Sequence, residues 1–299
     1  MSSSRKIFQV TSELLNNFMR LHVIETGFFK LDGGAMFGVV PKSIWQKTNP
    51  ADANNLCAWS MRCLLVEDGN KLILIDNGIG TKQSEKFLSY YYLHGGADLI
   101  TSIRNAGFSE DDVTDMFLTH LHFDHCGGGV RLHDGKPALT FKNAQYWSNA
   151  DHWDWAIRPN ARERASFLKE NLLPMQESGH LKFIDAHTPT PFSQFEIDYF
   201  SGHTEKMMVP KIKINGKTIC YVADLLPSVG HIPLAYVMGY DTRPLITLEE
   251  KEKFLNEAVD NQYILFFEHD TLNECCTLKR TEKGIRLDRA FKLNEIIGN

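Results

Sequence analysis

The stretch Thr119-His120-Leu121-His122-Phe123-Asp124-His125 gathers three histidines and an aspartate in one short segment. Histidine is scarce in this sequence, with 12 among 299 residues, so the cluster stands out from the composition. Neutral imidazole and carboxylate are ligands that zinc and related divalent metals prefer. His120 and His122 are two residues apart, so on an extended segment their side chains point to the same side. Asp124 and His125 follow after a turn and reach a second point. This spacing favours two metal ions over one, and the alternative is a polar turn with solvated histidines.

The overall composition limits the class of protein and its partners. A hydrophobic content of 43% is typical of a globular protein with a sizeable core, and 299 residues fit one large domain or two of average size. The formal net charge of -5 and an isoelectric point near 6.2 argue against a nucleic-acid partner held by general electrostatics. A neutral or mildly anionic small molecule is the expected substrate.

The termini and the cysteines bear on the cellular compartment. The first 18 residues have neither a continuous apolar region nor a small-residue cleavage site, so we predict no signal peptide. No apolar stretch reaches the length needed to span a bilayer, so no membrane partner is expected. The cysteines do not have the spacing of a disulfide framework, which predicts reduced thiols and a cytoplasmic protein. They are Cys57, Cys63, Cys126, Cys220, Cys275 and Cys276.

Short apolar segments bounded by turn residues predict a series of β-strands. They are Leu21–Lys30, Cys63–Glu67, Lys71–Asp76, Asp115–Thr119, Phe195–Phe200, Lys217–Ala223 and Tyr263–Phe267. Each of the last four leads into histidine or aspartate residues. In layered α/β proteins the loops at strand ends converge to form a site. We therefore expect seven side chains to meet although they are far apart in sequence: His120, His122, Asp124, His125, His203, Asp224 and His269.

Three segments between the strands have the features of helices. Asp98–Ala106 is predicted to stop at Gly107, and Ala161–Leu173 has a helical apolar spacing that ends before Pro174. Thr247–Asp260 opens with a Thr-Leu-Glu-Glu sequence. This predicts a capping box, in which the threonine hydroxyl and the second glutamate bond to free backbone N–H groups.

The order of these motifs resembles the metallo-β-lactamase fold superfamily. The resemblance rests on the 120–125 motif, Gly202-His203-Thr204, Asp224 at a strand end, and Glu268-His269-Asp270. It implies a single α+β domain over residues 1–299, built as a four-layer αββα sandwich of two sheets flanked by helices. It also implies one metal held by His120, His122 and His203, and a second held by Asp124, His125 and His269. Asp224 would bridge both metals.

The predicted site has the chemistry of a hydrolase. Two divalent cations roughly 3.5–4 Å apart repel each other unless anions lie between them, and Asp224 with a hydroxide would supply those anions. A hydroxide held in this way is a nucleophile at neutral pH. Asp124 would sit beside the nucleophile and the leaving group and could pass a proton to the departing alkoxide. Asp76 is expected to fix the tautomer of a ligand histidine, and the alternative is an ordinary turn aspartate.

Within the superfamily, the sequence is most similar to quorum-quenching N-acyl-homoserine lactonases and to organophosphate hydrolases such as methyl parathion hydrolase. The similarity is carried by residues 120–129, 223–241 and 265–270. Asp224 argues against a true β-lactamase, since members of this fold with that activity lack the bridging carboxylate. The chain departs from many lactonases at 205–207, where Glu-Lys-Met replaces Pro-Gly-His. It also has Pro227 where many lactonases have a tyrosine that holds the lactone.

Three residues are candidates for the substrate side of the site. His231 and Tyr240 lie in the segment after Asp224, and either could replace the missing tyrosine. Phe37 lies in the glycine-containing loop Asp32–Gly38. That loop is predicted either to line a pocket for an acyl chain or to serve only as a turn.

These features predict a metal-dependent hydrolase that opens a lactone ring, with N-acyl-homoserine lactones as the expected substrates. An aryl-ester or phosphotriester hydrolase using the same hydroxide is one alternative, and a non-catalytic metal-binding scaffold is another. Zinc is the expected metal, although cobalt, manganese and iron suit the same ligands. Homodimers are common among the resembling lactonases, so a homodimer is a further expectation.

Overall fold

The computed structural model describes residues 19–297 of the chain. The prediction that there is no signal peptide concerns residues 1–18 and lies outside the described residues. Within residues 19–297, no helix combines the length and the apolar character needed to cross a membrane.

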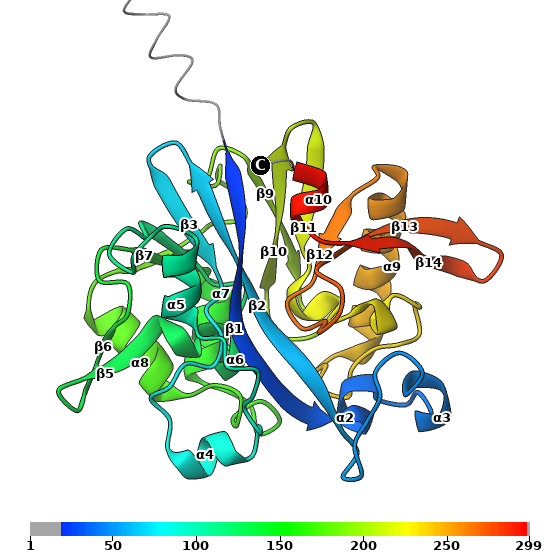
Figure 1. Cartoon of the computed structure of the whole chain (residues 1–299), viewed down its shortest axis with the longest axis horizontal. Helices are drawn as coiled ribbons and strands as arrows, with labels where there is room; N and C mark the ends of the chain where they lie inside the picture. The colour runs from blue at the N-terminus through cyan, green and yellow to red at the C-terminus, as the bar shows by residue number, and fades with distance from the viewer. Residues whose placement is uncertain (1–18, 298–299) are drawn as a thin grey trace, which may run out of the picture.

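A six-stranded mixed sheet forms the first half of the fold (Figure 1). Its spatial order is β1 (Arg20–Asp32), β2 (Leu56–Asp68), β3 (Lys71–Ile75), β4 (Asp115–Phe117), β7 (Gln145–Ser148) and β8 (Leu181–Phe183). The first three strands pair antiparallel, and β3, β4, β7 and β8 pair in parallel. Parallel neighbours need crossover connections, and the chain places helices between β3 and β4 and between β7 and β8.

The second sheet also has six strands, and it is built from the C-terminal part of the chain. Its spatial order is β14 (Gly284–Phe291), β13 (Cys275–Thr281), β12 (Ile264–Phe266), β11 (Lys217–Tyr221), β10 (Met207–Ile214) and β9 (Phe195–Phe200). Only β11 and β12 are paired in parallel among these described strands, and helix α9 (Pro244–Asp260) connects them.

Side-chain alternation along the central strands assigns the layers. On β2, Leu64 and Val66 join the core between the two sheets, whereas Cys63 and Leu65 join a second core on the outer face. That outer core is completed by α5 (Leu99–Asn105), α7 (Ala150–Ile157) and α8 (Lys169–Glu177), and α9 covers the other sheet (Figure 1). The predicted α+β fold, a four-layer αββα sandwich, is confirmed.

The remaining α-helices and β-strands are short. They are α2 (Gly33–Phe37), α3 (Lys42–Trp45), α4 (Glu85–Ser89), α6 (Phe123–Cys126), β5 (Val130–His133), β6 (Lys136–Leu139) and α10 (Asn294–Ile297). The loop expected at Asp32–Gly38 is therefore mostly a helical turn. The Asp32 carboxylate caps it by accepting a hydrogen bond from the Ala35 backbone N–H at 2.8 Å.

The helix predicted at Ala161–Leu173 is wrong in both of its bounds. Residues 161–168 form turns and extended chain, and α8 begins at Lys169 and continues through Pro174. Contacts that residues 161–168 make with other parts of the chain outweigh the helical spacing of their apolar residues. Glu163 accepts hydrogen bonds from Trp155 and Asn160, which ties this segment back to α7.

The capping box predicted for α9 is also wrong. The helix begins three residues earlier, with Pro244 in its first turn, where the missing backbone N–H costs nothing. Thr247 is consequently one turn inside the helix. The Glu250 carboxylate instead accepts hydrogen bonds from the backbone N–H groups of Ser201 and Gly202, at 2.7 and 2.9 Å. The helix therefore anchors the loop that carries His203.

Candidate metal centre

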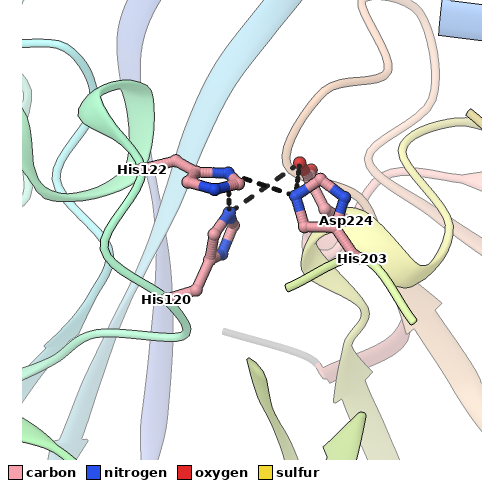
Figure 2. A group of neighbouring side chains, drawn as sticks. All are labelled: His120, His122, His203 and Asp224. Carbon is pink, nitrogen blue, oxygen red and sulfur yellow. Dashed lines mark hydrogen bonds and ion pairs between the residues drawn. The ribbon is translucent and has the colours of Figure 1, made fainter. Parts of the chain in front are cut away.

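The carboxyl ends of strands from both sheets meet at one place. Strands β9, β11 and β12 run in the same direction, because β9 and β11 both pair antiparallel with β10 and β12 pairs in parallel with β11. The chain after these strands carries His203, Asp224 and His269, and the chain after β4 carries the 120–125 motif. The structure gathers all seven predicted ligands in two groups: His120, His122, His203 and Asp224 (Figure 2), and Asp124, His125 and His269.

A short helix divides the metal motif between the two groups. His122 is the residue before α6, and Asp124 and His125 lie within the helix, so the chain turns between the two pairs of ligands. The chain then passes close to a neighbouring loop. A Cβ atom at Gly127 would lie 2.1 Å from the carbonyl oxygen of Ile79, so only glycine fits there.

The first group is a ring of nitrogen and oxygen atoms that face one another. His122 Nδ1 lies 3.1 Å from His120 Nε2 and 3.2 Å from His203 Nε2. Asp224 Oδ2 lies 3.1 Å from His203 Nε2 and 3.8 Å from His120 Nε2. Figure 2 shows the three imidazole rings turned toward one another and toward the carboxylate. All four side chains are buried.

Asp224 reaches the second group with its other oxygen atom. Asp224 Oδ1 lies 3.0 Å from His269 Nε2 and 3.6 Å from His125 Nε2, and these two nitrogens are 3.2 Å apart. Asp124 Oδ2 lies 3.8 Å from His125 Nε2 and 3.9 Å from His269 Nε2. The Asp224 carboxylate therefore contributes one oxygen to each of the two groups.

The outward-facing nitrogens of the ligand histidines contact oxygen atoms that accept hydrogen bonds. His203 Nδ1 donates to Asp241 Oδ1 at 3.0 Å. His269 Nδ1 donates to the carbonyl oxygen of Ser60 at 2.7 Å. These contacts orient both rings and place the ring proton on the outer nitrogen, away from the centre of the cluster.

Asp76 anchors two histidines of the motif, His120 and His125. Its two carboxylate oxygens accept hydrogen bonds from the backbone N–H and the hydroxyl of Thr119, at 2.8 and 2.6 Å. Because the Thr119 hydroxyl donates to Asp76, it accepts the proton of His120 Nδ1, 3.1 Å away. Asp76 Oδ2 also lies 3.1 Å from His125 Nδ1, and Glu268 Oε2 lies 2.9 Å from the same nitrogen. This is the position in which a carboxylate fixes the tautomer of a ligand histidine.

The arrangement of donors identifies the kind of ligand that fits. The outer nitrogens of His120, His125, His203 and His269 face acceptors, so when these rings are neutral their inner nitrogens carry lone pairs that point at the centre of each group. Imidazole lone pairs 3.1–3.2 Å apart repel each other unless a cation lies between them. Among the described residues, Asp224 Oδ1 has no hydrogen-bond partner although it is buried. Buried imidazole and carboxylate ligands of this kind fit divalent metal ions.

Asp224 is a carboxylate anion at neutral pH. Burial raises its pKa, but the positive charge that His203, His125 and His269 carry in the metal-free protein holds the pKa well below its usual range, and bound cations would act in the same way. A buried negative charge at this position would reduce the repulsion between cations bound on either side of it.

A cavity of about 330 Å³ borders the metal ligands, and His122, Asp124, His203, Asp224 and His269 form part of its wall. The size is in the range of small-molecule sites. Much of the remaining wall is apolar or aromatic and consists of Leu31, Met36, Tyr91, Phe123, Met238 and Tyr240. A substrate with a polar reacting group and an apolar substituent would match this division.

Of the three residues predicted to contact the substrate, one lines the cavity and two do not. Tyr240 lines the cavity, and although the residue is partly exposed, partial desolvation raises the pKa of its hydroxyl, which stays protonated and can donate a hydrogen bond. His231 and Phe37 do not line it. The ring of His231 stacks on Phe37 with 4.3 Å between ring centroids, and its nitrogens contact Ser228 Oγ and the Met36 carbonyl oxygen, both at 2.9 Å. Phe37, in α2, and His231 therefore pack next to Met36, which lines the cavity, without reaching the cavity themselves.

Several groups at the site have no signal in the sequence analysis. Asp241 holds His203 from 38 positions along the chain, and Glu163 lies 3.5 Å from His122. Tyr91 and Arg162 line the cavity. The position of Glu268 next to His269 could have suggested its role, whereas nothing in the sequence around Glu163 indicates a contact with a metal ligand.

His152 supports the motif from α7 and makes stability depend on pH. Its Nε2 accepts a hydrogen bond from the Leu121 backbone N–H at 2.9 Å, and burial lowers its pKa from 6.5 to about 3. Between these two pKa values His152 binds a proton in the unfolded state but not in the folded state. The contribution of neutral His152 to the free energy of unfolding is therefore complete above pH 6.5 and is lost as pH falls toward 3.

Urea unfolding should show this effect directly. Between about pH 7 and pH 5, the free energy of unfolding of the unsubstituted protein should fall by about 2 kcal/mol more than that of His152→Gln. Equal pH dependence of the two proteins would contradict the assignment.

The fold and the buried cluster together define a metal-binding αββα protein with an adjoining small-molecule cavity. The Metallo-beta-lactamase superfamily matches residues 62–269 of the chain. The chain belongs to this superfamily, which confirms the predicted family. Membership and the assembled ligands support the prediction of a metal-dependent hydrolase.

Known structures and proteins agree with this assignment. A probable metal-dependent hydrolase from Staphylococcus aureus is 27% identical, with a TM-score of 0.83, over 92% of this chain and 97% of that chain. The dizinc quorum-quenching lactonase AidC is 24% identical, with a TM-score of 0.76, over 93% of this chain and 96% of its own. An N-acyl homoserine lactonase from Bacillus cereus is 24% identical over 142 residues, which are 44% of this chain and 50% of that protein. The match therefore spans about half the length of that relative.

Proposed function

We propose that this protein is a dinuclear metal hydrolase that opens lactone rings, with N-acyl-homoserine lactones as its substrate class. The observation that carries the proposal is the position of Asp224, with Oδ2 in one ligand group and Oδ1 in the other. A carboxylate between two sets of buried imidazoles suits two cations better than one, because it supplies negative charge between them.

The residues present would hold one ion in each group. His120, His122 and His203 would bind the first, Asp124, His125 and His269 the second, and Asp224 would be shared. Zinc is the proposed metal, since three imidazoles or two imidazoles with a carboxylate are typical zinc ligands. Two bound ions would supply Lewis acidity and an activated water at neutral pH.

The chain's own groups would bind the substrate and move the proton. The apolar part of the cavity wall suits an acyl chain, and the Tyr240 hydroxyl can donate a hydrogen bond to a substrate carbonyl. Asp124 lies at the cavity wall and within 4 Å of two ligand nitrogens, at the edge of the reacting centre. Its carboxylate is proposed to take the proton released by the attacking water and to pass it to the departing alkoxide.

The relatives support a lactone substrate in part. The Bacillus cereus relative is an N-acyl homoserine lactonase, and the AidC structure contains a lactonase with its product, N-hexanoyl-L-homoserine. The second candidate is an aryl-ester or phosphotriester hydrolase. Pro227 favours it, because this residue cannot donate the hydrogen bond of the tyrosine that many lactonases use to hold the lactone.

Side-by-side turnover by purified protein separates these candidates. Metal content should first be measured on material purified without added metal, with two ions per chain expected. An acyl-homoserine lactone, an aryl ester and a phosphotriester should then be compared by kcat/KM at equal protein concentration. We expect the lactone to be the best substrate. A lactone value far below the ester or phosphotriester value would reject the lactonase, and two bound metals without turnover would favour a non-catalytic scaffold.

The compartment is proposed from the cysteines. All six are free and buried in the described structure. Burial raises the pKa of Cys126 to about 12, and its thiol donates to the Leu121 carbonyl oxygen, so it acts as a packing residue beside the metal motif. Unpaired thiols throughout are typical of a reducing compartment, which supports a cytoplasmic enzyme.

A further inference from the structure

Glu163 is a buried carboxylate beside the metal ligands that the proposed reaction does not use. It lies in the turn segment between α7 and α8, and 3% of the residue is exposed. Its Oε2 accepts hydrogen bonds from Trp155 Nε1 and Asn160 Nδ2, both at 2.7 Å. These two contacts fix the plane of the carboxylate and leave the second oxygen to point elsewhere.

The second oxygen points at the back of a metal ligand. Glu163 Oε1 lies 3.5 Å from His122 Nε2, on the side of the ring opposite to the nitrogen that faces the first group. Within residues 19–297, neither atom has a hydrogen-bond partner, although both are buried. The Thr204 hydroxyl, which is also buried without a partner in the described structure, lies near the same carboxylate. Buried polar atoms that face each other in this way are expected to pair, and a small movement of the His122 ring would bring Nε2 within reach of Oε1.

The charge environment of Glu163 supports this pairing. Among the described residues, no lysine or arginine nitrogen lies within 4.0 Å of its carboxylate. The neighbours of its oxygens include the neutral donors of Trp155 and Asn160 and the imidazole of His122. Burying a carboxylate without a cationic partner is unfavourable. A cation bound on the far side of the His122 ring would provide the missing positive charge through the imidazole.

We propose that Glu163 is a positioning residue for the first metal: it accepts the Nε2–H of His122 and thereby directs His122 Nδ1 at the ion. The inference rests on the metal centre of the proposed function. A carboxylate behind a ligand histidine fixes the tautomer, orients the ring and increases its basicity. In the described structure Glu163 is the carboxylate that faces Nε2 of His122, the ring nitrogen turned away from the first group.

The same segment reaches a second ligand of the first group. Arg162 donates hydrogen bonds to the carbonyl oxygens of Gly239 and Asp241, and the Asp241 carboxylate accepts the hydrogen bond from His203. Arg162 and Glu163 also line the cavity. The turn between α7 and α8 therefore supports two ligands of one ion, and it forms part of the substrate wall.

The test is the affinity for zinc of Glu163→Gln, measured by competition with a chelator of known affinity. Glutamine has nearly the same shape, but it presents an N–H donor either to His122 or to the Trp155 and Asn160 donors. We expect the affinity for one of two zinc ions to fall by roughly 10–100-fold, with the other unchanged. Glu110→Gln is the matched control, because Glu110 pairs with Arg104 and Arg131 away from the cavity.

Thermal unfolding with and without zinc separates positioning from a structural role. If Glu163 positions His122, the substitution should reduce the rise in Tm that zinc produces and change the Tm of the zinc-free protein little. Trp155→Phe, which removes one donor but keeps the carboxylate, should weaken zinc binding less than Glu163→Gln.

Two results would overturn the inference. Unsubstituted protein that binds two zinc ions, together with Glu163→Gln that binds both with the same affinity, would reject the role of Glu163 and leave the proposed function standing. Unsubstituted protein that binds no zinc would reject both.

Discussion

Asp224→Asn is expected to lower kcat/KM by on the order of 10³-fold and to reduce the bound metal from two ions to one. The amide keeps the shape of the side chain but removes the negative charge between the two groups. Its nitrogen would also face either the His203 or the His269 imidazole, where Asp224 now presents oxygens at 3.1 and 3.0 Å. Metal analysis after gel filtration and steady-state kinetics on the preferred substrate measure both effects.

Asp112→Asn is a suitable control for this change. Asp112 is exposed, and its carboxylate accepts hydrogen bonds from Ser109 on the surface. The control should keep its metal and its turnover. If Asp224→Asn also kept two ions and full kcat/KM, Asp224 would not be the shared ligand and the dinuclear proposal would fail.

Asp124→Asn is expected to lower kcat by about 10²–10⁴-fold for a lactone, the range typical of lost general acid or base catalysis. The lactone alkoxide is a poor leaving group and needs a proton as the ring opens. A nitrophenolate leaves without one. The loss should therefore be distinctly smaller for a nitrophenyl ester than for the lactone, and the ratio of the two effects is the quantity to measure.

This ratio separates proton delivery from metal binding. Asp124 lies near His125 and His269, so the substitution also removes a ligand of the second group. Loss of the metal alone would slow both substrates to the same extent. Equal losses for the ester and the lactone would contradict a proton-donating role for Asp124, and metal analysis of the same sample would show whether ligation explains them.

The strands could be predicted where burial makes the sequence uniformly apolar. Lys71–Asp76, Lys217–Ala223 and Tyr263–Phe267 correspond to β3, β11 and β12. Other strands have weaker signals. β10 contains Pro210, a residue that argues against a strand. β13 and β14 form a hairpin with many exposed charged residues, so they lack the apolar run of a central strand.

The helices show how tertiary contacts override local preference. Thr247 and Glu250 have the spacing of a capping box, but Glu250 bonds to the loop that carries His203. The helical apolar spacing of Ala161–Leu173 is interrupted because Glu163 is held by Trp155 and Asn160. At Glu250 a contact with a distant segment outweighs the local pattern, and at Glu163 buried contacts with neighbouring residues and with α7 do so.

The sequence alone determined the family, the sandwich fold and the set of residues that converge, because metal ligands require particular side chains at fixed spacings after buried strands. Only the tertiary structure decided which atoms face each other. It placed the two oxygens of Asp224 in different groups, put Asp241 and Glu163 behind His203 and His122, and moved His231 and Phe37 out of the cavity wall. Such contacts join segments far apart in the chain, and their partners are ordinary charged or aromatic residues, so they leave no local pattern to read.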